Sequence, residues 1–374
     1  MNQLKNWIIN RFGPACLAGV TAGDWARLCV DNGFRFSPRY WGKVPYLTVS
    51  SLLTSGFATA ESLVHGRSIR ETEPQAPVFI VGSWRSGTTF LHTLMCLDER
   101  FGCPNLFQTM YPHSFLVSEP WLRPMLELGT PTKRFMDNMA MNLSEPHEDE
   151  MALAILSRRS NMLSWAFPHR ADNYDRFLDF KDTTKADRDA WKKAFDYFVR
   201  KMTYKTDGKQ LVLKSPNHTA RIKMLLELYP NAKFLHIYRN PYHVFRSMVH
   251  MATAVTQVWG LQYFPLEDIP AMVVDTYKRL YEAYFEQVDA IPSGQLIEVR
   301  YEDFSSSPVE TLAHVYEELN LPDFSATRPN IEAHVAARSS YKKNKHSETA
   351  PDHLAMINEQ WSAMFERFGY QLTR

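Results

Sequence analysis

A short apolar run that leads directly into a glycine-bounded loop is the feature that most constrains the fold of this chain. Residues 77–81 read Pro-Val-Phe-Ile-Val, and the loop of residues 82–89 begins with Gly82. A continuous apolar run of this length, partly β-branched, is typical of a buried parallel strand. After Gly87 the apolar residues take helical spacing. The segment therefore predicts a strand, a tight loop and a helix.

The same unit recurs in looser form along the chain. Residues 211–213, 234–238 and 296–299 are further short runs that are apolar apart from His236 and Glu298, with helical patterns between them. Asn240 and Pro241 follow the second of these runs as a favourable N-cap and first helical residue. Strands that alternate with helices predict an α/β fold, with a P-loop-like parallel sheet flanked by helices on both faces. Ligands of such sheets bind at the carboxyl ends of the strands.

The first part of the chain has a different character. We expect residues 1–75 to form a mostly helical N-terminal extension packed on the core, and residues 76–374 to form the α/β domain. Apolar residues recur at helical spacing near the start, at Leu4, Trp7, Ile8 and Phe12. Two interpretations stay open: a helix packed on the protein body, or an interfacial helix that adds peripheral membrane contact. The sequence has neither a long apolar run nor a signal-peptide layout, so we expect a cytoplasmic location.

Composition excludes some functions. The formal net charge is +1, which gives no reason to expect a nucleic acid partner, so any anion site has to be built locally. The four cysteines show neither CxxC spacing nor a paired framework, and they are Cys16, Cys29, Cys96 and Cys103. We expect them to be buried or inert thiols in a reducing compartment, and we expect no metal site.

The loop of residues 82–89 carries the chemistry of an anion site. Glycines let its backbone approach a ligand, and the next helix directs its N-terminus at an anion. Arg85 adds a bidentate cation, while Ser86, Thr88 and Thr89 add hydroxyl groups. The glycine spacing matches the Walker loop, in which lysine follows the second glycine. Thr88 occupies that position here, so phosphate binding is favoured and nucleoside triphosphate hydrolysis is not.

A second motif follows another predicted strand. Arg239 directly follows the run of residues 234–238, and Ser247 lies in the helix after it. The long arginine side chain can fold back over the first turns of that helix. Arg239 and Ser247 are therefore expected to hold one phosphate from two sides.

With both motifs, the chain resembles the superfamily of sulfotransferases that use 3′-phosphoadenosine 5′-phosphosulfate, especially a bacterial branch whose loop reads GxxRSGTT. The resemblance covers residues 77–304. It implies that the loop contacts the 5′-phosphosulfate through Arg85, Ser86, Gly87, Thr88 and Thr89. The family's 3′-phosphate motif, an arginine followed eight residues later by a serine, fits Arg239 and Ser247.

Sulfuryl transfer needs positive charge at the leaving oxygen and a base for the proton of the acceptor. Arg85 and Lys214, which matches a lysine of the soluble family members, are expected to serve the leaving oxygen. His218 is our first candidate for the base, although it lies two positions later than the family's histidine. Glu148 in an acidic stretch is the second candidate, and its position before a helix also suits simple stabilisation of the helix dipole.

The resemblance implies a hydroxyl or amine acceptor that is a small or lipid-like molecule, and no metal requirement. Aromatic residues such as Phe107 and Trp165 are expected near the acceptor, and the basic segment 338–345 is either a phosphate clamp or a solvated loop. Two alternatives stay open. One is a P-loop kinase-like phosphotransferase, and the other is a nucleotide-binding protein without catalytic activity.

Overall fold

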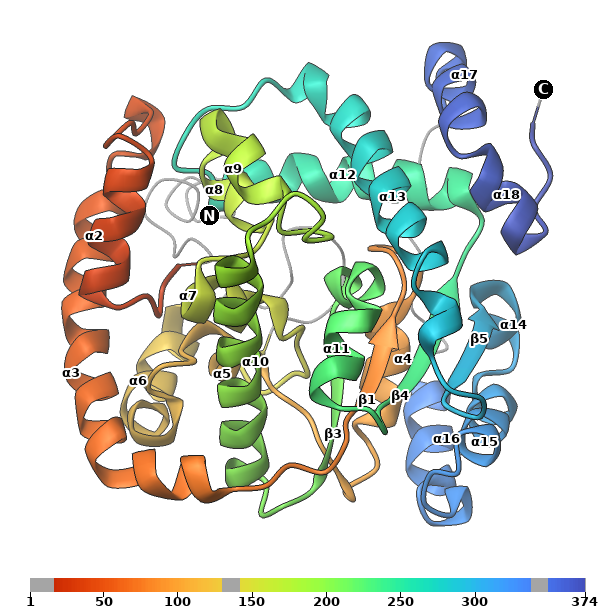
Figure 1. Cartoon of the computed structure of the whole chain (residues 1–374), viewed down its shortest axis with the longest axis horizontal. Helices are drawn as coiled ribbons and strands as arrows, with labels where there is room; N and C mark the ends of the chain where they lie inside the picture. The colour runs from red at the N-terminus through yellow and green to blue at the C-terminus, as the bar shows by residue number, and fades with distance from the viewer. Residues whose placement is uncertain (1–16, 130–141, 338–348, 374) are drawn as a thin grey trace. The chain divides into compact units, whose positions relative to one another are not determined.

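The computed structural model describes residues 17–129, 142–337 and 349–373 (Figure 1). The chain divides into two compact units. The first unit comprises the residues up to 73 together with 104–208 and 251–268, and the second comprises 74–103, 209–250 and the residues from 269 onwards. The helical N-terminal region therefore shares a unit with two later segments. The division into domains at residues 75 and 76 stays a prediction.

The second unit contains a five-stranded sheet in which all neighbouring strands are parallel. Its order is β2 (Phe101–Gly102), β3 (Gln210–Lys214), β1 (Val78–Val81), β4 (Lys233–Tyr238) and β5 (Leu296–Arg300). The four strands predicted from apolar runs are confirmed. Strand β2 was not predicted, because two residues offer no periodicity. Along the central pair, Ile80 of β1 lies opposite Lys214 of β3.

Both faces of this sheet are covered, which confirms the predicted fold class. On one face, Val78, Ile80 and Leu235 belong to a buried cluster with residues of four helices. These helices are α4 (Thr88–Met95), α14 (Tyr301–Ser306), α15 (Pro308–Glu318) and α16 (Arg328–Ala337). On the other face, Phe79 packs against His218 of the 3-10 helix η3 (Pro216–Ala220), and His236 packs against Tyr284 of α13 (Ile269–Phe285).

The helix predicted after β4 is α12 (Pro241–Trp259). Asn240 precedes it, and its side-chain oxygen accepts a hydrogen bond from the Tyr242 amide at 3.0 Å, as expected of an N-cap. The second unit also contains η5 (Val288–Ala290), η6 (Phe324–Ala326) and the helices α11 (Ile222–Leu228), α17 (Pro351–Gln360) and α18 (Ser362–Phe368).

The first unit is helical in the described residues, which confirms the predicted helical character of the N-terminal region. Its elements are α2 (Ala22–Asp31), η1 (Pro38–Tyr40), α3 (Lys43–Glu71), α5 (Leu106–Met110), α6 (Phe115–Gly129), α7 (Glu150–Ser157), α8 (Leu163–Ala166), η2 (Pro168–Arg170), α9 (Ala171–Asp175), α10 (Lys185–Lys205) and η4 (Leu266–Asp268). None of the described helices combines the length and the apolar character that crossing a membrane requires. The helix expected around Trp7 and the basic segment 338–345 lie outside the described residues.

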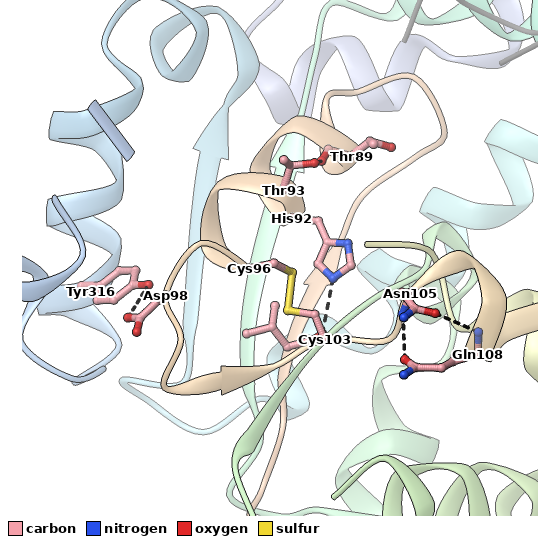
Figure 2. The surroundings of a disulfide bond; sticks show 10 residues. Thr89, His92, Thr93, Cys96, Asp98, Cys103, Asn105, Gln108 and Tyr316 are labelled. Carbon is pink, nitrogen blue, oxygen red and sulfur yellow. Dashed lines mark hydrogen bonds between the residues drawn. A yellow bond between two sulfur atoms is a disulfide. The ribbon is translucent and has the colours of Figure 1, made fainter. Parts of the chain in front are cut away.

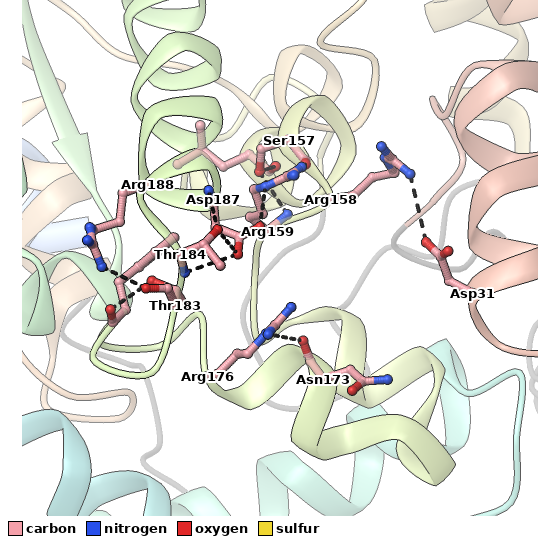
Figure 3. A network of polar contacts seen from close by, with 12 residues as sticks. Asp31, Ser157, Arg158, Arg159, Asn173, Arg176, Thr183, Thr184, Asp187 and Arg188 are labelled. Atoms are coloured by element: carbon pink, nitrogen blue, oxygen red, sulfur yellow. Dashed lines mark hydrogen bonds and ion pairs between the residues drawn. The ribbon is translucent and has the colours of Figure 1, made fainter.

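Polar contacts connect the helices of the first unit (Figure 3). Arg158 follows α7 and pairs with Asp31 of α2 at 3.8 Å. Its neighbour Arg159 donates to Asp187 at 3.1 Å, and Asp187 also forms a capping box with Thr184 at the start of α10. The turn after α7 is thereby tied to both α2 and α10.

One sequence-based expectation is wrong. Cys96 and Cys103 form a disulfide rather than two separate thiols (Figure 2). Cys96 caps the end of α4, and the short β2 brings the chain back so that the two Cα atoms are 6.0 Å apart, a normal separation for a disulfide. Cys29 remains a buried thiol, and burial raises its pKa to about 11.

Candidate active site

The loop between β1 and α4 has an unusual backbone. Gly82, Arg85 and Gly87 all have positive φ, at 138°, 68° and 105°. A Cβ on Gly82 would lie 2.2 Å from the Ile237 carbonyl oxygen, so glycine is required there. Arg85 adopts the left-handed conformation despite its side chain, which costs on the order of 1–3 kcal/mol and is a feature of functional sites.

Neighbouring elements hold the first half of this loop. The Gly82 amide donates to Thr219 Oγ1 at 2.7 Å, and the Ser83 amide donates to the Tyr281 hydroxyl at 3.3 Å. The Ser86 hydroxyl donates to the Ser83 carbonyl at 2.8 Å and is fully buried. Two of the amides expected to face an anion are therefore occupied by side chains. The Ser86 amide also donates to the Ser83 carbonyl, at 3.3 Å, so both donors of Ser86 are engaged within the loop.

The N-terminus of α4 supplies further donors. Thr88 and Thr89 are its first residues, and the N–H groups of a first helical turn have no acceptor within the helix. These groups, with the partial positive charge of the helix end, favour an anion. Thr88 is buried and Thr89 is half-buried, so the loop and the helix start form a fixed, largely enclosed backbone surface.

The two predicted phosphate motifs meet in the structure. Arg85 Nε donates to Ser247 Oγ of α12 at 2.9 Å, and Arg239 donates to the Arg85 carbonyl at 3.2 Å. Residues more than 150 positions apart in the sequence therefore form one cluster. Both guanidinium groups are half-buried, and their charges face the same loop.

Tyr301 supports both motifs. The guanidinium of Arg239 lies 4.2 Å from the centre of its ring, and the ring edge lies 2.4 Å from where a Cβ on Gly87 would be. Burial lowers the pKa of Arg239, but an arginine stays charged at neutral pH. Among the described residues no carboxylate forms an ion pair with Arg239. A half-buried cation held in this way is suited to an external anion.

The start of α12 is fixed from the same side. The Glu302 carboxylate accepts from the Asn240 amide at 3.2 Å and from the Tyr370 hydroxyl at 2.6 Å. The segment Tyr301–Glu302 thus holds the end of β4 and the start of α12. The resemblance to the family implied a structural role for residues 301–303, but sequence analysis predicted neither these contacts nor those of Thr219 and Tyr281, because each contact joins distant parts of the chain.

The predicted catalytic residues of the second unit lie at the end of β3. Lys214 is the last residue of this strand and only 5% exposed. His218 lies on η3 and has no exposed surface, and its ring packs edge-on against Phe79 with 5.4 Å between the ring centres. A base has to touch the acceptor, and a fully buried ring does not do so in this conformation.

Glu148 belongs to the first unit. It is half-buried and stands two residues before α7, whose N-cap is Asp149. Asp149 and Glu150 are buried, and the Glu150 carboxylate accepts from the Ser160 hydroxyl at 2.5 Å. Glu148 is therefore more accessible than Asp149 and Glu150.

One group of metal-ligand type is present in the described residues. His92, Cys96 and Cys103 place their ligand atoms within 4.8 Å of one another (Figure 2). The two sulfur atoms are bonded to each other, so neither is a free thiolate here. Sequence analysis did not expect these residues to come together.

The fold and the site define an α/β protein with a glycine-bounded loop and a cluster of two arginines at the carboxyl edge of a parallel sheet. The chain belongs to the sulfotransferase family, since the sequence model of that family matches residues 77–326. It is 34% identical over 370 residues to the omega-hydroxy-beta-dihydromenaquinone-9 sulfotransferase Stf3 of Mycobacterium bovis and of Mycobacterium tuberculosis. The match covers 99% of this chain and 94% of each relative.

Two solved structures share the fold. The sulfotransferase STF9 of Mycobacterium avium superposes with a TM-score of 0.70 at 15% identity, over 94% of this chain and 98% of that chain. The sulfotransferase STF1 of Mycobacterium tuberculosis gives a TM-score of 0.60 at 19% identity, over 94% of this chain and 87% of that chain. Both the predicted family and the predicted fold are thereby confirmed.

Proposed function

We propose that this sulfotransferase uses 3′-phosphoadenosine 5′-phosphosulfate as its donor. The observation that carries the proposal is the cluster of Arg85, Arg239 and Ser247 around the loop that begins α4. The 5′-phosphosulfate would lie against Arg85 and the first turn of α4, where Gly87, Thr88 and Thr89 present backbone and hydroxyl donors. The 3′-phosphate would lie against Arg239 and Ser247.

The chemistry follows from the direction of charge movement. In an in-line transfer the sulfur–oxygen bond to the donor phosphate breaks, and negative charge develops on that oxygen. Arg85, the dipole of α4 and Lys214 at the end of β3 would stabilise this charge. A base accepts the proton of the acceptor hydroxyl as the new sulfate ester bond forms. Since Thr88 replaces the Walker lysine, a phosphotransferase that uses ATP fits the loop less well.

We propose a different order of candidates for the base. Because His218 has no exposed surface, whereas Glu148 is half-buried, we assign the base to Glu148 and a packing role to His218. The acceptor is proposed to be a lipid-like alcohol, since the similar Stf3 proteins are named for a hydroxylated menaquinone. A small hydroxyl or amine compound is the alternative.

Calorimetry with adenosine 3′,5′-bisphosphate tests the donor. We expect binding without magnesium, and we expect it to be tighter than binding of ATP with magnesium. Preferential, magnesium-dependent binding of ATP would instead support the phosphotransferase. Bisphosphate binding without transfer to any of a panel of alcohols and amines, followed with labelled donor, would support a non-catalytic nucleotide-binding protein.

A further inference from the structure

The long helix α3 has apolar residues on its exposed side. Five large side chains are 59–82% exposed, and they are Val49, Leu52, Leu53, Leu63 and Val64. At 100° per residue these five positions fall within an arc of about 120°, so they form one face of the helix. We call them, together with Trp41 just before the helix, the α3 face. Trp41 is 62% exposed.

Two charged residues of α3, Lys43 and Glu61, point the other way. Lys43 is fully buried and donates to the Val258 and Gly260 carbonyls. Glu61 is buried and pairs with Lys201 of α10, and its carboxylate also accepts from the Leu116 amide at 2.7 Å. These contacts fix the rotation of the helix. The α3 face therefore cannot turn inward without breaking a buried ion pair.

An amphipathic surface helix normally turns its apolar residues inward and its charges outward. Over much of its length, helix α3 has the opposite arrangement, with apolar residues exposed and its charged residue buried. Between Val44 and Gly66 its only charged residue is the buried Glu61, so the exposed side carries no charge there. An exposed apolar surface of this length indicates a binding partner.

The surroundings of the α3 face indicate what that partner is. Phe34 is 64% exposed in the turn after α2, and the exposed Arg35 and Arg39 lie between it and Trp41. At the other end, Arg67 and Arg70 are exposed on the last turns of α3, where Arg67 pairs with the exposed Glu71 at 2.8 Å and Arg70 leaves this border with a net positive charge. Aromatic rings and arginines at the borders of an apolar surface match the interface of a bilayer, where rings lie among headgroups and arginines meet lipid phosphates.

We propose that the α3 face docks on the surface of a membrane that contains anionic lipids. Charge argues against a second copy of the chain as the partner. Two copies of the α3 face would bring their basic borders together, and neither copy has an exposed carboxylate between Val44 and Gly66 to pair with them. The contact is peripheral, and it goes beyond the proposed sulfuryl transfer because it requires neither donor nor acceptor.

Flotation of the full chain with vesicles tests the proposal. We expect binding to phosphatidylcholine vesicles that contain phosphatidylglycerol, and weaker binding to phosphatidylcholine alone. The double substitution Leu52→Glu and Leu53→Glu should lower partitioning by at least roughly tenfold, because two leucines no longer enter the apolar layer. Arg35→Gln with Arg39→Gln should lose roughly fivefold per arginine on the anionic vesicles, with little change on the neutral ones.

Leu372→Glu is the matched control, since it places the same charge at an exposed leucine of the other unit and should bind like the unchanged protein. Three results would overturn the proposal. The unchanged chain could fail to float with either vesicle. A dimer that the leucine substitutions dissociate, seen by analytical ultracentrifugation, would make a second copy the partner. A lower melting temperature of the double variant would show that another part of this chain covers the α3 face.

Discussion

Arg239 is half-buried and has no ion-pair partner among the described residues. Its proposed role, binding the 3′-phosphate of the donor, can therefore be tested by removing its charge. Arg239→Ala should weaken binding of adenosine 3′,5′-bisphosphate by about 2–5 kcal/mol, because a charge-assisted contact with the 3′-phosphate is lost. Binding of adenosine 5′-phosphate, which lacks that phosphate, should change much less. Isothermal titration calorimetry with both ligands measures the difference.

Arg328→Ala is the control for this comparison. Arg328 lies on α16 in the same unit, and its guanidinium pairs with Glu332 of the same helix at 3.3 Å rather than with the loop. It should leave both affinities nearly unchanged. Equal losses for the two ligands in Arg239→Ala would mean that this residue supports the fold, and that the 3′-phosphate binds elsewhere.

The base is a second question at the scale of one residue. Glu148→Gln keeps the shape of the side chain and removes its ability to accept a proton, so turnover should fall by about 10²- to 10⁴-fold while bisphosphate affinity is kept. His218→Gln should retain most of the activity per folded molecule, with a lower melting temperature because the ring packs on Phe79. The reverse pattern of turnover would return the role to His218.

Residues that share a local motif were predictable from the sequence, and residues that support them were not. Arg85 was visible because glycines bracket it, and Arg239 because it follows a strand and precedes a helix cap. Thr219, Tyr281 and Tyr301 contact the loop from more than 100 positions away. No spacing records such contacts, which arise only when the sheet brings its strand ends together.

At the scale of elements, short runs of mostly apolar residues identified four strands. The run is continuous in β1, because that strand is buried on both faces. Strand β2 was missed because it is two residues long and is defined by pairing with β3 alone. The Cys96–Cys103 disulfide was missed for the same reason. The return of the chain through β2, rather than the cysteine spacing, brings the two sulfur atoms together.

The pairing of β4 with β5 should make stability depend on acid pH. Glu298 of β5 accepts from His236 Nδ1 and from the Tyr284 hydroxyl, each at 2.8 Å. Burial by itself raises the pKa of Glu298, but the hydrogen bonds and the charge of its neighbours outweigh it and lower this pKa to about 2. A carboxyl whose pKa is lowered by folding stabilises the protein above its unfolded-state pKa, and this contribution is lost as the pH falls towards 2.

Glu298→Gln should therefore lower the melting temperature at neutral pH by roughly 3–10 °C, and the difference should shrink steadily below about pH 4.5. Circular dichroism melts across this pH range provide the measurement. Glu310→Gln, at an exposed position of α15, is the control and should follow the unchanged protein. A difference that stays constant down to pH 2 would show that Glu298 acts through packing rather than through its charge.

At the scale of the whole molecule, the division into two units separates the proposed binding residues. The donor residues named above, from Arg85 to Ser247, belong to the second unit, whereas Glu148 and the α3 face belong to the first. The sequence predicted the α/β part and the helical N-terminal region. It could not predict that the latter shares a unit with residues 104–208 and 251–268, because that grouping depends on tertiary contacts.

Hydrogen exchange with and without adenosine 3′,5′-bisphosphate should reveal this separation. A ligand at about 100 times its Kd stabilises the state that binds it by about 2.7 kcal/mol, which slows exchange through unfolding of that unit by roughly 100-fold. We expect this protection in β1, α4 and the start of α12, and little in α2 and α3. The Arg239→Ala variant at the same ligand concentration should lose most of it. Protection concentrated in α2 and α3 would place the donor in the first unit, and equal protection throughout would mean that the two units unfold together.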